Sequence, residues 1–119
     1  SVEWLDREDL FDAVTALSGS GPAFVFRFAD ALAAAGASVG LDPAQAQRLA
    51  RATLVGAAAL LDASKEDAAT LADRVASRGG TTRAGLDVLD DGEALRDLLT
   101  RTLGAAKKRG AELASAARG

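Results

Sequence analysis

Hydrophobic positions along the chain recur at the three- and four-residue spacing of amphipathic helices. One stretch places them at Ala46, Leu49, Ala50, Thr53, Leu54, Ala57 and Leu60 or Leu61. No segment alternates apolar and polar residues for long, and isoleucine and tyrosine are absent, so no strand is predicted. The pattern therefore predicts an all-α fold, a six-helix bundle-like domain.

Start and stop signals divide the chain into six helices with short connections. The clearest start is at Asp42, which caps a helix, with Pro43 in its first position and Gln45 reaching back as in a capping box. The predicted helices run from Glu8 or Asp9 through Leu17, from Pro22 to Gly36–Gly40, from Pro43 to about Ala63, from a Ser64 cap to Gly79–Gly80, from Thr82 to Leu89, and, after a break with Asp90 and Glu93 at capping-box spacing, from about Leu95 until fraying past Ala111. No connection is long enough to separate domains, so a single domain over residues 1–119 is expected.

The composition favours close helix packing and self-association. Hydrophobic residues make up 49% of the 119 residues but aromatic residues only 4%, and alanine supplies most of the difference. Alanine-rich helices cover little area each, and a chain of this size leaves much of its potential burial unmade. A second copy of the chain would supply the missing contacts.

Charge and missing residue types exclude several function classes. The net charge of −3 does not favour nucleic-acid binding, which needs a basic face. Without cysteine or histidine there is no disulfide framework or thiolate, and the commonest metal ligand is missing, so no metal is expected. No uncharged apolar run reaches about 18 residues, so no transmembrane helix is predicted. No signal peptide is recognised, and we expect a cytoplasmic protein.

The loop Ser77–Thr82 is the strongest candidate for a binding site. Gly79 and Gly80 allow a tight turn, and an apolar helix follows. A glycine-rich turn at a helix N-terminus presents unpaired N–H groups to an anion. The loop does not fit the nucleotide phosphate loop, so a small carboxylate is the better guess. The alternative is that the glycines only end one helix and Thr81 only caps the next.

Side chains of the same loop are candidates for polar contacts with a substrate. Ser77 could bind a carboxylate oxygen, and the hydroxyls of Thr81 and Thr82 could hold an amine or imine nitrogen. A threonine is a poor general acid, so its role would be positioning.

A second glycine-rich segment, Ser18-Gly19-Ser20-Gly21, precedes Pro22. It is not a dinucleotide fingerprint, because a helix rather than a strand precedes it and Phe24 stands where the third glycine would be. We interpret it as a kink between two helices whose hydroxyls and N–H groups could line a site.

The two glycine-rich segments, in this order and at this distance, resemble the C-terminal helical domain of pyrroline-5-carboxylate reductase. Four blocks carry the resemblance, and together they span most of the chain. They are residues 12–24 (DAVTALSGSGPAF), 34–41 (AAGASVGL), 53–58 (TLVGAA) and 75–86 (VASRGGTTRAGL).

The resemblance implies a helical domain that intertwines with a second copy into a homodimer and supplies most of the substrate pocket. The family reduces 1-pyrroline-5-carboxylate to L-proline with NAD(P)H, which an N-terminal Rossmann domain holds. By resemblance, Ser77, Gly79, Gly80 and Thr81 would bind the substrate carboxylate. Thr82 would be the catalytic residue, bonded to the ring nitrogen, and Ser18–Gly21 would lie near the nicotinamide.

Two departures from the family matter. The chain lacks the Rossmann domain, so alone it is expected to dimerise and bind substrate without catalysis. Arg78 stands where the family usually has proline, which frees the loop and adds a charge. The sequence leaves open the effect of Arg78, the preference for NADH or NADPH, and assembly beyond a dimer. It also leaves open whether a chain that begins at Ser1 without any methionine is a natural product, a truncation or a proteolytic fragment. The alternatives are a non-catalytic helical dimerisation module and a related imine or hydroxyacid dehydrogenase.

Overall fold

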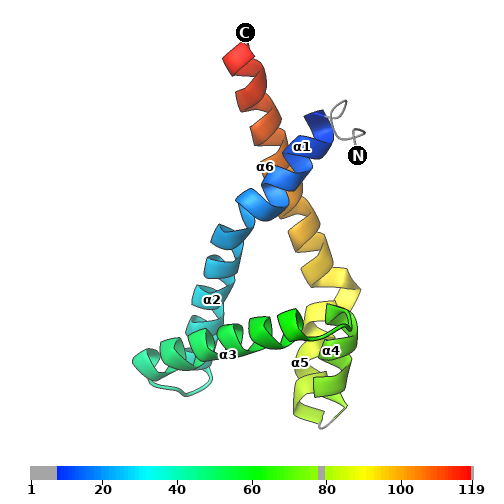
Figure 1. The fold of residues 1–119 in the computed structure, drawn as a ribbon. Coiled ribbons are helices and arrows are strands. Elements are labelled where there is room, and N and C mark those ends of the chain that lie inside the picture. The colour runs from blue at the N-terminus through cyan, green and yellow to red at the C-terminus, as the bar shows by residue number, and fades with distance from the viewer. Residues whose placement is uncertain (1–7, 78–79, 119) are drawn as a thin grey trace. The chain divides into compact units, whose positions relative to one another are not determined.

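Helices account for all the regular structure in residues 8–77 and 80–118, the part of the chain described by the computed structural model (Figure 1). The elements are α1 (Glu8–Val14), the π-helical turn η2 (Thr15–Gly19), α2 (Gly21–Ser38), α3 (Pro43–Ala63), α4 (Ala68–Ala76), α5 (Gly80–Asp90), the 3-10 turn η3 (Asp91–Glu93) and α6 (Ala94–Arg118). The predicted all-α class is confirmed, and the described residues contain the six α-helices expected from the sequence.

The chain divides into two compact units. Residues up to Phe24 and from Leu89 onward form the first unit, and residues Val25–Val88 form the second. No helix in the described residues is long and apolar enough to cross a membrane.

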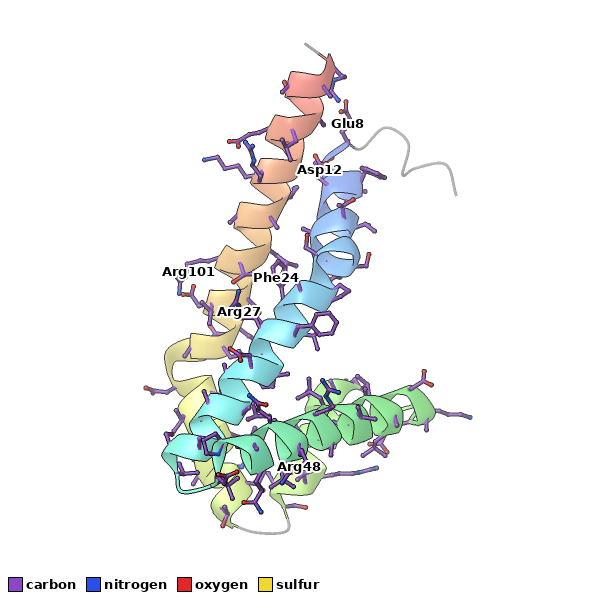
Figure 2. All side chains as sticks on the ribbon, turned by 90° about the vertical axis from the view of Figure 1, so that its left-hand side faces the viewer. Glu8, Asp12, Phe24, Arg27, Arg48 and Arg101 are labelled. Atoms are coloured by element: carbon purple, nitrogen blue, oxygen red, sulfur yellow. The ribbon has the colours of Figure 1, made fainter. Side chains whose placement is uncertain are left out.

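In the first unit, α1 and η2 pack along α6. Figure 2 shows Glu8 and Asp12 of α1 beside the C-terminal part of α6. The Arg118 guanidinium donates a hydrogen bond to Glu8 Oε2 at 2.7 Å. Helix α6 continues to Arg118, where this contact is made. The expected fraying past Ala111 is therefore wrong.

In the second unit, α2 and α3 approach closely through small residues. Ala33, Ala46 and Ala50 are buried. A Cβ built on Gly36 would lie 3.3 Å from the Ala46 Cβ, so a larger residue at position 36 would force the helices apart. This packing supports the inference that alanine-rich helices must come close together.

The start of α3 confirms its predicted cap. Asp42 has extended backbone, and its Oδ2 accepts a hydrogen bond from the Gln45 N–H at 3.3 Å, with Pro43 in the first turn. Gly40 has φ +123°, a conformation that only glycine adopts readily. No bond from the Gln45 side chain back to the Asp42 backbone occurs among the described residues, so the cap is one-sided.

The start of α4 corrects the predicted Ser64 cap. Asp67 caps the helix instead, because its Oδ1 accepts from the Thr70 N–H at 2.9 Å. The Ser64 hydroxyl accepts from the Glu66 N–H at 3.0 Å and closes a short turn before the helix. Hydrogen bonds from Thr70, first from its side chain and then from its backbone, lower the pKa of the Asp67 carboxyl below its usual value.

The break between α5 and α6 lies where it was predicted, but the expected capping box is wrong. Asp90 makes no side-chain cap. Gly92 (φ +59°) and Glu93 (φ +58°) turn the chain through left-handed backbone instead. Glu93 lies 3.7 Å from the Arg96 guanidinium, so its carboxylate faces forward into α6.

The described residues bury little large apolar surface. The buried hydrophobic residues are five alanines, Ala16, Ala33, Ala46, Ala50 and Ala76. Leucine, valine and phenylalanine side chains lie exposed on all six helices: Phe11 and Phe26 are each 71% exposed, and Val55 is 65% exposed. Exposure on this scale is unusual for a monomeric soluble domain.

Candidate functional site

The turn between α4 and α5 carries the predicted carboxylate site. Ser77 directly follows α4, and Gly80 is the first residue of α5. Gly79, assigned to the same site, and Arg78 lie outside the described residues. Thr81 and Thr82 lie inside the first turn of α5, so Thr81 is not the cap that the alternative interpretation required.

The first turn of α5 has the features an anion site needs. The first N–H groups of an α-helix have no partner within the helix, and the N-terminal end carries partial positive charge. A Cβ built on Gly80 would meet no atom within 4 Å, which leaves room for a ligand against the backbone. The Thr82 side chain is half-buried.

Ser77 is already engaged with the end of α4. Its N–H donates to the Asp73 carbonyl at 2.9 Å, and its hydroxyl donates to the Arg74 carbonyl at 2.8 Å. Its oxygen can still accept a hydrogen bond, but a carboxylate needs a donor. Ser77 would therefore have to rotate about χ1 to bind an acid group.

Two ion pairs flank this turn. Arg74 pairs with Glu66 in the turn before α4. Arg83 of α5 donates from Nη2 to Asp73 Oδ1 of α4 at 3.1 Å. Their separations of eight and ten residues lie outside the local spacings at which helical pairs are found from sequence.

The segment Ser18–Gly21 belongs to the first unit, whereas Ser77–Thr82 belong to the second. The predicted interruption is a π-helical turn followed by a bend at Ser20, whose N–H donates to the Thr15 carbonyl at 2.9 Å. The Ser18 hydroxyl donates to the Val14 carbonyl at 2.8 Å. Pro22 has no N–H, so the Ser18 carbonyl loses its usual donor four residues on. Turns of this kind are frequent at functional sites.

Two of the grooves that border α2 and α3 in the second unit differ in polarity. One, of about 400 Å³, is lined by Asp30, Gln47, Arg48 and Arg51 among small residues, and Figure 2 labels Arg48 on α3. The other, of about 590 Å³, is mainly apolar and is lined by Val25, Phe26, Leu54, Val55 and Ala58, with Ala29 and Arg51. Neither groove was predicted, because both depend on where two helices cross. No group of acidic residues in the described part of the chain could hold a metal ion.

A family model for pyrroline-5-carboxylate reductase dimerisation matches residues 8–113. The chain belongs to this family. The resemblance inferred from the four sequence blocks is thereby confirmed.

Individual reductases are similar to this domain over most of its length. The chain is 44% identical over 106 residues to a pyrroline-5-carboxylate reductase of Synechocystis, covering 89% of the chain and 39% of that protein. A Pseudomonas aeruginosa reductase is 42% identical over 111 residues, covering 93% of the chain and 40% of that protein. The chain thus spans about two fifths of the length of these relatives.

Solved structures of reductases share the fold of this domain. A Coxiella burnetii pyrroline-5-carboxylate reductase has a TM-score of 0.82 at 38% identity, covering 90% of the chain and 39% of that protein. A Plasmodium falciparum pyrroline carboxylate reductase with NADP bound has a TM-score of 0.77 at 30% identity, covering 87% of the chain and 39% of that protein. The described residues of the pyrroline-5-carboxylate reductase dimerisation domain contain no strand, and the chain does not include the Rossmann domain of the family.

Proposed function

We propose that this chain is the dimerisation and substrate-binding domain of a pyrroline-5-carboxylate reductase, the enzyme that makes L-proline from 1-pyrroline-5-carboxylate with NAD(P)H. Family membership supports the reaction class. The observation that carries the substrate assignment is the first turn of α5, with free space at Gly80 and the half-buried Thr82 beside it.

In the proposed mechanism, the chain's residues bind and orient the substrate. Backbone N–H groups from Gly79 to Thr81, with Ser77 after rotation, hold the carboxylate, where the end of helix α5 stabilises negative charge. The Thr82 hydroxyl bonds the ring nitrogen and fixes the C=N plane. When bound, NAD(P)H would supply the hydride that the imine carbon needs, and the ring nitrogen would take a proton from water.

The cofactor is proposed to be held mainly outside this chain. The described residues offer no strand followed by a glycine-rich turn and helix, so they do not fit a dinucleotide phosphate site. The family resemblance gives Ser18–Gly21 a supporting role near the nicotinamide, and a Cβ on Gly21 would meet nothing within 4 Å. The chain alone is therefore expected to be inactive as a reductase.

A second copy of the chain is the proposed partner. The exposed apolar residues on all six helices and the five-alanine core leave much apolar surface to cover, and the matched family model is one of dimerisation. A second copy would cover this surface while preserving the fold. We also propose a cytoplasmic location, as expected from the sequence.

Titration of the 119-residue chain with L-proline, followed by amide chemical shifts, tests the proposal. Saturable shifts concentrated at Ser77 and Gly80–Thr82 are expected. Shifts scattered over other helices, or none at millimolar L-proline, would favour the alternative of a helical dimerisation module without a substrate. Glycine, which has the same charged groups but no ring, is the matched control and should bind more weakly.

A further inference from the structure

The ion pair between Asp73 and Arg83 joins the two helices on either side of the α4–α5 turn. Asp73 lies in the last turn of α4 and Arg83 in the first turn of α5, and the Arg83 Nη2 is 3.1 Å from Asp73 Oδ1. The Asp73 side chain is 72% exposed and that of Arg83 is 45% exposed. The pair spans the turn that precedes Gly80.

Neither charge is where its own helix favours it. A carboxylate is disfavoured near a helix C-terminus, and a cation is disfavoured near a helix N-terminus. Asp73 lies in the last turn of α4, which ends at Ala76, and Arg83 lies in the first turn of α5, which begins at Gly80, so both charges are in unfavourable positions. Local helix preference therefore does not account for either residue, whereas their contact across the turn does.

Asp73 also holds the residue on the near side of the turn. Its carbonyl accepts from the Ser77 N–H at 2.9 Å, while its carboxylate accepts from Arg83. One residue thus fixes both the start of the turn and the first turn of α5. The Arg74–Glu66 pair anchors the same end of α4 to the segment before it.

We propose that the Asp73–Arg83 pair is a positioning strut that holds the backbone N–H groups of Gly80–Thr82 in the orientation that binds the substrate's acid group. The proposal rests on the proposed function of that turn. In this proposal Arg83 acts through its contact with Asp73 rather than as a ligand of the acid.

Four variants of the 119-residue chain test the strut: Arg83→Gln, Asp73→Asn, the double variant and Arg83→Lys. Hydrogen exchange of the Gly80–Thr82 amides and the Kd for L-proline are measured for each. Because the pair is exposed, each single variant should speed exchange and weaken binding by about two- to fivefold. The double variant should bind L-proline no more weakly, and exchange no faster, than either single variant. Arg83→Lys, which keeps the positive charge, should lose less binding than Arg83→Gln.

A pair at a similar distance provides the control. Arg101 Nε lies 3.2 Å from Asp97 Oδ2 on α6, in the other unit, with side chains 68% and 66% exposed. Arg101→Gln should leave the Gly80–Thr82 amides unchanged. In about 1 M salt, where the Debye length is about 3 Å, wild type should approach the double variant.

Three results would overturn the strut. Additive losses in the double variant would mean that the two residues act separately. Tighter binding in Asp73→Asn with weaker binding in Arg83→Gln would make Arg83 a direct ligand. Faster exchange that extends to α3 would mean that the pair stabilises the fold at large. If wild type binds no L-proline, the proposed substrate role fails, and the exchange data still decide whether the pair orders the turn.

Discussion

Two hydroxyls of the proposed site differ in their surroundings. The Ser77 hydroxyl donates to the Arg74 carbonyl at 2.8 Å, while the Thr82 side chain lies half-buried in the first turn of α5. Binding through Ser77 must first break its hydrogen bond, which offsets most of what a new bond to a ligand contributes. At the scale of single residues, Ser77 should therefore contribute little to ligand affinity.

Replacing Thr82 by valine should weaken L-proline binding about three- to tenfold, because one hydrogen bond contributes roughly 0.5–1.5 kcal/mol. Ser77→Ala should weaken it less than about threefold. Calorimetric or shift titration of the two variants measures both constants. Thr53→Val is the control, since the Thr53 hydroxyl donates to its own helix at Leu49. Equal affinities for Thr82→Val and wild type would remove Thr82 from the site.

The candidate residues could be read from the sequence, but their bonding state could not. Glycines followed by two threonines indicate a helix N-terminus locally. Ser77 bonds locally to the end of α4, but the Asp73–Arg83 pair depends on how α4 and α5 face each other. That arrangement is not encoded in any short spacing.

At the scale of elements, the helix starts were easier to predict than the caps. Asp42 precedes a proline, so only one residue fits as cap. Before α4, Ser64 and Asp67 both fit, and the choice depends on the turn that Ser64 closes with Glu66. The length of α6 involves a contact between Arg118 and Glu8, which no local pattern reveals.

The Asp67 cap makes α4 sensitive to acid. The pKa of Asp67 is lower in the folded chain than in the unfolded chain, where it is near 3.8. The ionised cap therefore stabilises the fold at pH values above 3.8, and this stabilisation is lost as the pH falls through the lower pKa of the folded chain. Asp67→Ala should lower the Tm by roughly a few degrees at pH 7, and the difference from wild type should shrink below about pH 4. Asp67→Asn, which keeps an acceptor oxygen but loses the charge, should have a Tm between those of wild type and Asp67→Ala at pH 7.

Thermal melts of the three proteins between pH 2.5 and 7 check this prediction. A difference between Asp67→Ala and wild type that stays constant over the whole range would show that the carboxylate charge is not what stabilises α4.

The link from α2 to α3 depends on one left-handed glycine. Gly40 has φ +123°, so Gly40→Ala should cost roughly 1–3 kcal/mol of stability even though a Cβ there would meet no atom within 4 Å. Gly104→Ala in α6, also without a neighbour within 4 Å, should instead stabilise by roughly 0.5–1 kcal/mol. Chemical denaturation of both variants compares backbone strain with helix propensity, and a stabilised Gly40→Ala would contradict the assignment of strain.

At the scale of the whole molecule, the apolar surface decides the oligomeric state. Isolated leucines on a surface need no explanation, but apolar side chains exposed along every helix do. The groove lined by Val25, Phe26, Leu54 and Val55 is a mainly apolar hollow of about 590 Å³. A second copy of the chain is the partner that the family suggests for this surface.

Replacing Phe26 by aspartate should therefore weaken self-association. Phe26 is 71% exposed in the single chain, and covering such a side chain contributes roughly 1.5–3 kcal/mol. With one Phe26 in each copy, the dimer Kd should rise at least about tenfold. Sedimentation equilibrium measures this shift, and Gln47→Glu, which adds one negative charge in the neighbouring polar groove, controls for charge alone. A wild-type chain that stays monomeric at about 100 µM would contradict self-association through this groove. A Phe26→Asp variant that dimerises as well as wild type would show that the copies do not meet at this groove, because burying a carboxylate without a partner at an apolar contact costs free energy.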